Sequence, residues 1–586
     1  MKFTILVLLC LRISFVHAED PKPIAAPFLP AGFISWFWPS SIVVGDWLYL
    51  HGGEIHTNDT TKTTDAQSLL PVPQTYAIDL TKSWTTSGVT AKEFKQIEAF
   101  RPSRRPEIFY DKSHHMVYCY GGEYFGPTYG VDGNFDKFDA NVKPEVWGFT
   151  PVESGDVAWS QQFAGSTSNS FLNSSIEYAL TASSDEKHFS IGGMTTWLIE
   201  DENGPDPGLN IQIVMDEFVT YDYATQEFTN ITHANHTFLG EAHFVPHYGE
   251  EGVLVFFGGK EPVDRGVSPT DISATLGDIH IYDIRTGQFY LQHATNPPAG
   301  RYSSCSVGVS SADNSSYEIF LYGGDMGTAS NSDFAALSTV FILTLPAFTW
   351  LEVPTPTKSF RSNHKCQQIG PKSISEHNQR QMLSIGGWNP PVNTNWAAYS
   401  DPWSSSMNIF DLSALTWNDT YDPNAKAYTK PDLVNNHYLH NDRFPPIWGE
   451  AILESIFNNS ASATTTGTSP TLTPEAKAGT SVGAIAGGVV GGVAVAALVG
   501  FLLFWFCWRK RKANNGVEPS RQDYGGYENV KEMGDGATIE LSVGKDMPRR
   551  ELSEIICSDG NYLEMTRDEN WKLMNISRRS RYHDII

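Results

Sequence analysis

The sequence predicts an all-β protein built from a repeated unit, and two features of its 586 residues carry this prediction. Six Gly-Gly pairs, each closing a short apolar run, recur at steps of 63 to 71 residues. Self-similarity at an even period indicates a repeat architecture. The runs, such as WLYLHGG and VLVFFGG, are rich in β-branched and aromatic residues, as short buried strands are. The pairs are Gly52-Gly53, Gly121-Gly122, Gly192-Gly193, Gly258-Gly259, Gly323-Gly324 and Gly386-Gly387.

A second signature follows most of the glycine pairs and predicts two further strands. Tyr282-Asp283 precedes Thr286 and Phe289, and Tyr221-Asp222 precedes the same residue types at the same spacing. We interpret the Asp as the opening of a tight turn, and the aromatic as the start of a fourth strand that packs over the glycines. Several units also open with an arginine, namely Arg105, Arg301 and Arg361. Six units of four antiparallel strands predict a β-propeller, which hides sheet edges by radial repetition.

The residues of this unit resemble the kelch repeat: a di-glycine followed by Tyr-Asp-x-x-Thr-x-x-aromatic. The resemblance covers about Phe33 to Asn418, within a propeller that we place at residues 31–456, with six blades or, as the alternative, seven. The second unit departs from the pattern, because Trp147-Gly148-Phe149 leads to Trp159 across an insertion. The whole chain resembles fungal single-span membrane proteins with a kelch or galactose-oxidase-like propeller. The resemblance implies interaction more often than catalysis.

The two ends of the chain predict a type I membrane topology. Residues 1–18 combine Lys2, an apolar stretch and Ala18, as a secretory signal peptide does. Residues 482–508 carry no charge and are long enough to span a bilayer, and four basic residues follow at once. The positive-inside rule then places residues 509–586 in the cytoplasm, as a tail that we expect to be disordered. We expect the protein at the plasma membrane and cell surface or in the secretory pathway.

Residues 457–481, before the span, are mostly Ser, Thr, Ala, Gly and Pro, which predicts an extended stalk. Seven sequons precede the span and agree with passage through the secretory pathway. The expected glycosylation sites are Asn58, Asn173, Asn230, Asn235, Asn314, Asn418 and Asn458.

The net charge of −25 resides in the expected ectodomain. The tail holds 14 basic and 14 acidic residues and the signal peptide holds two basic ones, which leaves 25 basic and 52 acidic residues outside the membrane. An acidic surface argues against nucleic acid and anionic lipid as main partners of the ectodomain.

Three cysteines fall in the propeller region. Cys305 and Cys366 occupy first-strand positions of adjacent units, so a disulfide between them is one interpretation and two free thiols is the other. Cys119 lies inside a second strand, and we expect it to be a buried thiol.

The connections after the glycine pairs are long, and they predict where a partner binds. They join the second strand to the third in each unit, so they emerge on one face of the propeller. Long loops on a rigid scaffold are common binding sites. Exposed aromatic and acidic residues there suit a protein or carbohydrate ligand, although aromatics that fill gaps between loops are the alternative. The candidate binding residues are Glu123, Tyr124, Tyr129, Trp197, Trp388, Trp396 and Trp403.

Catalysis is the weaker interpretation of this sequence. A copper radical oxidase shares the kelch propeller, but it needs a Cys-Tyr cross-link and a histidine from a C-terminal domain for which this chain has little room. His243 and His247 lie four apart, which in a strand separates them by about 13 Å, too far to share a metal ion. No cofactor, metal ligand or catalytic residue is therefore assigned.

The predicted span carries a stripe of small residues that includes Gly483, Gly487 and Gly491. Small residues four apart let two helices approach closely, so a homodimer is a candidate assembly. Three functions remain, in this order: a cell-surface protein- or glycan-binding scaffold, a copper-radical-oxidase-like enzyme, and a dimerising sensor that signals through its tail.

Overall fold

The computed structural model describes most of the predicted propeller and four short strands of the tail. The described residues are 26–57, 69–126, 145–163, 176–199, 209–232, 237–262, 271–327, 336–354, 359–388, 401–458, 539–541, 554–556, 562–565 and 571–574. The predicted signal peptide, the stalk beyond Asn458 and the span at 482–508 lie outside them. Among the described residues, no helix has the length and apolar content needed to cross a membrane.

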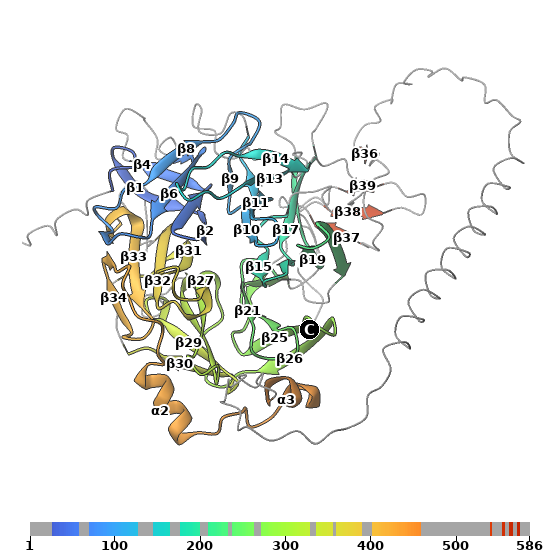
Figure 1. Cartoon of the computed structure of the whole chain (residues 1–586). Helices are drawn as coiled ribbons and strands as arrows, with labels where there is room; N and C mark the ends of the chain where they lie inside the picture. The colour runs from blue at the N-terminus through green and yellow to red at the C-terminus, as the bar shows by residue number, and fades with distance from the viewer. Residues whose placement is uncertain are drawn as a thin grey trace, which may run out of the picture. The chain divides into compact units, whose positions relative to one another are not determined.

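Six four-stranded antiparallel sheets, the blades, follow one another along the chain (Figure 1). Blades 1 to 3 are β2 (Ser40–Val44), β3 (Trp47–His51), β6 (Gln74–Asp79) and β8 (Lys92–Lys95); β10 (Glu107–Asp111), β11 (Met116–Tyr120), β13 (Val146–Phe149) and β14 (Ser160–Phe163); and β15 (Leu180–Ser183), β16 (Lys187–Ile191), β19 (Glu217–Asp222) and β20 (Glu227–Thr232). The second blade thus forms despite its irregular sequence.

Blades 4 to 6 repeat the same order. They are β21 (Glu241–Val245), β22 (Val253–Phe257), β25 (Asp278–Asp283) and β26 (Gln288–His293); β27 (Tyr302–Ser310), β28 (Tyr317–Asp325), β29 (Phe341–Leu345) and β30 (Thr349–Glu352); and β31 (Ser362–Ile369), β32 (Gln381–Trp388), β33 (Met407–Asp411) and β34 (Thr416–Asn418). The predicted all-β architecture with six blades is confirmed within the described residues.

Each di-glycine pair contacts one residue of the next blade, which lies shortly before the first strand of that blade. We call these six residues the anchors, and they are Trp36, Ser103, Ile176, Thr237, Arg301 and Arg361. In the first five blades, the N–H of the second glycine donates to the carbonyl of the next blade's anchor at 2.7 to 3.0 Å. Both glycines have positive φ, and a Cβ on Gly323 would lie 2.2 Å from the Arg361 carbonyl oxygen. Only glycine therefore permits this approach.

Five of the six anchor side chains also hold their own blade, by donating to the carbonyl of its first glycine. The donor atoms are Trp36 Nε1 (3.0 Å), Ser103 Oγ (3.3 Å), Thr237 Oγ1 (3.1 Å), Arg301 Nη1 (3.2 Å) and Arg361 Nη1 (2.8 Å). Trp, Ser, Thr and Arg side chains thus make the same hydrogen bond in five different blades. The sequence placed Arg105 with Arg301 and Arg361, but Ser103 is the anchor of blade 2.

The Tyr-Asp signature forms the turn that it predicts. The Asp222 carboxylate accepts the backbone N–H groups of Ala224 and Thr225 at 3.0 and 3.1 Å, and so closes the turn between β19 and β20. The aromatic that follows pairs across the hairpin. Hairpin register places Phe228 opposite Tyr221, and their ring centroids lie 4.6 Å apart. The signature therefore marks a cross-strand aromatic pair.

Several connections after the glycine pairs are ordered ribbons. In blade 1, β1 (Phe33–Phe37), β4 (Glu54–Thr57) and β5 (Leu69–Pro71) form a three-stranded sheet. Two-stranded ribbons elsewhere are β9 (Ser103–Arg104) with β12 (Glu123–Tyr124), β17 (Met194–Ile199) with β18 (Leu209–Val214), and β23 (Lys260–Pro262) with β24 (Asp271–Ser273). Each of these sheets contains a strand that starts directly after a glycine pair, namely β4, β12, β17 or β23, so they lie on one face, which we call the connection face. The opposite face carries the turns within the two hairpins of each blade, and we call it the turn face.

The ring closes without exchange of a strand between the first and last blades. Each blade takes its four strands from consecutive sequence, and β35 (Thr420–Tyr421) pairs only with β7 (Trp84–Thr85), beside blade 1. The N–H of Trp38 donates to the Asn363 carbonyl at 3.0 Å, and the Ser41 hydroxyl donates to Gln367 Oε1 at 3.0 Å. Backbone and side-chain hydrogen bonds thus join blade 6 to blade 1.

Residues 419–458, which we call the C-terminal strap, pair with β7 beside blade 1 and then contact the turns of blades 4 to 6 on the turn face. Figure 1 shows the two helices of the strap at the lower edge of the propeller. The strap contains α2 (Asp432–His440) and α3 (Ala451–Asn458). In α3, Leu453, Ile456 and Phe457 join the core formed by blades 4 and 5. The predicted boundary between propeller and stalk, at residue 456, falls inside this helix.

The described part of the tail contains strands where the sequence predicts disorder. They are β36 (Ile539–Leu541), β37 (Glu554–Ile556), β38 (Tyr562–Met565) and β39 (Trp571–Met574). They form one antiparallel sheet in the order β36-β39-β38-β37.

Candidate functional site

The connection-face end of the central channel is ringed by six residues with left-handed backbone. Each follows an anchor by two positions, and their φ angles lie between 45° and 61°. They are Trp38, Arg105, Tyr178, Leu239, Ser303 and Asn363. None is glycine, so each stores strain that the surrounding contacts must hold.

Backbone hydrogen bonds run between neighbouring members of this ring. Arg105 N–H donates to the Trp38 carbonyl at 3.0 Å, and Leu239 N–H donates to the Tyr178 carbonyl at 2.9 Å. Ser303 N–H continues the ring to the Leu239 carbonyl at 2.9 Å. The ring holds the start of each first strand, and therefore fixes the side chains that enter the channel.

The first strands of all six blades line a cavity of about 100 Å³ below this ring. A wider opening of about 310 Å³ lies toward the turn face and shares Ile108, His243 and Lys365 with the first cavity. Lys112 and His377 line its outer part. The channel is thus polar at both ends, and the narrower end has room for a few waters or a small ligand group.

Two cations and two carboxylates line the narrow cavity: Arg105, Lys365, Glu107 and Glu241. Burial lowers the pKa of Arg105 and of Lys365, while Glu241 opposes the change for both. Burial raises the pKa of Glu241, whereas the Ser306 hydroxyl, Arg105 and Lys365 act to lower it. Charges of both signs thus face a small volume, which suits a zwitterionic or strongly polar ligand group over an apolar one.

Glu107 is held by three side chains of its own and the neighbouring blade. The hydroxyl of Tyr120 donates to one carboxylate oxygen, and His188 Nε2 lies 3.3 Å from that same oxygen. The Ser190 hydroxyl donates to the other oxygen at 2.8 Å. These contacts hold the Glu107 carboxyl in one position beside the cavity.

Two channel histidines are neutral. Burial lowers the pKa of His243 to about 3, and its Nε2 lies 2.7 Å from the Ser306 hydroxyl. That hydroxyl donates to Glu241 at 2.5 Å, so Nε2 of His243 carries the hydrogen. Burial also lowers the pKa of His364, a residue that is 7% exposed.

Among the described residues, two histidines lie within reach of other possible metal ligands, and in each group some of those ligands already have another partner. His243 and His247 bond separate serines of the next blade, Ser306 and Ser310. His364 approaches Cys305 and Cys366, but those two sulfurs are joined in a disulfide. Asp185, Glu376 and His377 also approach one another, with the Lys112 ammonium bonded to both carboxylates. Cys119 is buried and free, and burial raises the pKa of its thiol.

The seven predicted binding residues have different environments. Glu123 pairs with Arg104 at 3.2 Å and accepts the Tyr178 hydroxyl at 2.6 Å, beside the ring. Tyr124 is 5% exposed, so it offers almost no surface to a ligand. Trp403 lies over the Arg361 guanidinium at 3.7 Å and contacts the rings of Tyr322 and Trp417. Trp388 is half-buried at the end of β32. Tyr129, Trp396 and the side chain of Trp197 lie outside the described residues.

The structure also places part of the other predicted sites. Cys305 and Cys366 join the first strands of blades 5 and 6 across a Cα–Cα distance of 5.2 Å. Asn230, Asn418 and Asn458 are exposed, and Asn314 is half-buried in the turn between β27 and β28. The predicted sites Asn58, Asn173 and Asn235 lie outside the described residues.

The cavity was not predicted from the sequence, although the sequence contains one signal of it. The cavity residues lie immediately after the anchors, and His364-Lys365 directly follows Arg361-Ser362-Asn363. Alternation along a first strand would have placed Arg105 and Glu107 on one side, facing the channel. The misplaced anchor in blade 2 concealed this pattern.

Comparisons with known proteins agree with the repeat. A kelch repeat-containing protein of Arthroderma benhamiae (strain ATCC MYA-4681 / CBS 112371) is 26% identical over 182 residues, which is 30% of this chain and 24% of that protein. The repeats are kelch-like. The match spans about a quarter of the relative's length. A solved structure titled "Structure of YjhT" is 10% identical and covers 66% of this chain and 97% of its own, with a TM-score of 0.41. No protein-family model matches the chain.

Proposed function

We propose that this protein is a cell-surface binding scaffold that receives a protein or glycan partner on its connection face. This proposal rests on a difference between the two faces of the propeller. The C-terminal strap covers the turn face of blades 4 to 6, whereas the connection face bears the ribbons, the left-handed ring and the charged cavity. Kelch-like propellers commonly serve as interaction modules, which supports this choice.

The path of the chain supports the same orientation. The strap ends at Asn458 on the turn face, and the predicted stalk and span follow it in sequence. A tether that leaves from the turn face would direct the connection face away from the membrane. The small-residue stripe of the span would then bring two propellers together with both connection faces available.

A matched pair of surface substitutions tests this proposal. Leu70 on β5 is 39% exposed on the connection face, and Val152 between β13 and β14 is 46% exposed on the turn face. We expect Leu70→Arg in the full chain to weaken binding to a panel of glycans and extracellular protein domains at least tenfold, because a partner would have to desolvate the new charge.

Val152→Arg is the control, and we expect it to leave binding unchanged. The measurement is surface-based binding, with thermal unfolding to show that both variants fold. Loss of binding in Val152→Arg alone, or no effect of either variant on a partner that binds the wild type, would refute the use of the connection face.

A further inference from the structure

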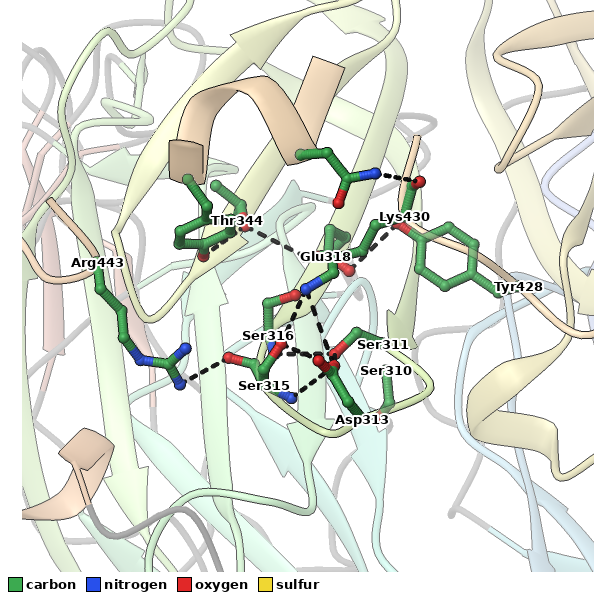
Figure 2. Close-up of polar contacts among 12 residues, drawn as sticks. Ser310, Ser311, Asp313, Ser315, Ser316, Glu318, Thr344, Tyr428, Lys430 and Arg443 are labelled. Atoms are coloured by element: carbon green, nitrogen blue, oxygen red, sulfur yellow. Dashed lines mark hydrogen bonds and ion pairs between the residues drawn. The ribbon is translucent and has the colours of Figure 1, made fainter. Parts of the chain in front are cut away.

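A buried carboxyl lies where the C-terminal strap meets blade 5. Glu318, in β28, is fully buried and accepts the Tyr428 hydroxyl at 3.2 Å and the Thr344 hydroxyl at 3.3 Å (Figure 2). Thr344 in turn meets the hydroxyl of Tyr438, in α2, at 2.8 Å. One carboxyl thus lies at the centre of contacts that reach two tyrosines of the strap.

The cations of the strap contact the neighbouring turn and not this carboxyl. Lys430 Nζ donates to the Ser315 hydroxyl at 2.8 Å and lies 3.8 Å from Asp313, and Arg443 donates to the Ser315 carbonyl at 2.8 Å (Figure 2). Among the described residues, no ion pair within 4 Å involves Glu318. Burying an ionised carboxylate that faces only hydroxyls costs free energy, whereas a neutral, protonated carboxyl at the same place can be buried at a much lower cost.

We propose that Glu318 is protonated while the strap is docked, and that release of this proton to solvent loosens residues 428–443 from blade 5. The strap would then dock firmly in acid and weakly at neutral pH. Because the strap is the last described segment before the predicted stalk, this contact would control how firmly the propeller is held to its tether.

The direction of the pH effect follows from the proton count. Burial raises the pKa of Glu318 from 4.5 to about 7, although the Ser316 hydroxyl, Lys430 and the hydroxyls of Tyr428 and Thr344 oppose the change. An undocked strap exposes the carboxyl, whose pKa then returns toward 4.5. The docked state therefore binds more protons between pH 4.5 and 7. Docking is most favourable below pH 4.5, weakens through this window and stays weak above it.

The other titratable groups around Glu318 do not reproduce this dependence. Hydrogen bonds from Ser311 and Ser315 hold the pKa of Asp313 low, despite burial. Burial raises the pKa of all four surrounding tyrosines, so they remain neutral in this window; they are Tyr248, Tyr317, Tyr428 and Tyr438. Burial lowers the pKa of His437, in α2, so its protonation would loosen the helix in acid, the opposite direction.

Hydrogen–deuterium exchange of the full chain tests the proposal. After correction for intrinsic exchange, we expect protection of amides in residues 428–443 to fall roughly 50- to 100-fold from pH 5 to pH 8, with amides of β10 and β11 unchanged. Glu318→Gln keeps a neutral group of the same shape, so its strap should be protected to the same extent at every pH.

Glu352→Gln, an exposed carboxyl in β30 of the same blade, is the matched control and should retain the wild-type dependence. Tyr428→Phe keeps the carboxyl but removes a donor to its ionised form, so the midpoint should move to higher pH. Strap protection in the wild type that does not change between pH 5 and 8 would overturn the proposal, as would an unchanged slope in Glu318→Gln. If Glu318→Gln does not fold, an unmoved midpoint in Tyr428→Phe would overturn it.

Discussion

Blades 5 and 6 bury an arginine at the same anchor position and compensate its charge differently. Arg301 and Arg361 are both fully buried, and each donates to the carbonyl of the first glycine of its own blade. Arg361 also pairs with both oxygens of Asp401 and lies under the Trp403 ring. Blade 6 therefore places a full negative charge against the guanidinium.

Blade 5 offers Arg301 no carboxylate within 4 Å in the described residues. Its guanidinium donates instead to the carbonyls of Ala299 at 3.2 Å and Ala336 at 3.4 Å, and lies 5.2 Å from the Phe341 ring centroid. Burial lowers the pKa of Arg301 to about 10. A buried anchor arginine can therefore be accommodated either by a carboxylate or by backbone carbonyls. The connection after the glycine pair supplies the difference, because it contributes Asp401 in blade 6 and Ala336 in blade 5.

The largest effect should come from breaking the pair in blade 6. Asp401→Ala leaves the Arg361 guanidinium buried without a counter-charge, and we expect a loss of about 3–5 kcal/mol in the free energy of unfolding. Urea denaturation of the full chain, followed by tryptophan fluorescence, measures the change. The exposed pair Arg285–Glu250, at 2.6 Å, is the control. Glu250→Ala should cost less than about 1 kcal/mol, and equal losses in both variants would contradict this account.

Removing the arginine of blade 5 should have a smaller effect. Arg301→Met keeps much of the volume and removes a buried charge that has no partner carboxylate, but it leaves the Gly323 carbonyl without this donor. We expect a loss of about 2 kcal/mol in the free energy of unfolding. Arg361→Met should cost more, because it leaves Asp401 buried and unpaired. If the two methionine variants unfold at the same urea concentration, the two environments are energetically equivalent and the distinction is wrong.

The sequence predicted the blades well because each blade is a local unit. The di-glycine pairs and the Tyr-Asp turns depend on contacts within one repeat or with the next, so six units in register specify the sheets. The strap depends on distant contacts. Leu453 and Phe457 of α3 pack on blades 4 and 5. Nothing local to residues 451–458 indicates where that apolar stripe is buried.

The site was harder to predict for a related reason. The five donating anchors are of four residue types, so the hydrogen bond that they share is invisible to a comparison of repeats by residue identity. Arg105 resembles the anchors Arg301 and Arg361 in sequence, yet it adopts φ of 45° two positions later and enters the channel. A shift of two positions thus separates a structural arginine from a cavity residue.

The smallest effect should come from the aromatic ring beside Arg301. Phe341 is 8% exposed, and its ring faces a guanidinium that has no carboxylate partner. Phe341→Leu keeps an apolar side chain but removes the π face, and we expect a loss of about 1 kcal/mol in the free energy of unfolding.

The matched change Trp403→Leu in blade 6 removes a ring 3.7 Å from an arginine that already has Asp401 as its partner. A double-mutant cycle with Arg301→Met isolates the ring contribution. If Phe341→Leu costs the same with Arg301 and with Met at that position, the ring does not stabilise the buried charge, and the backbone carbonyls alone compensate it.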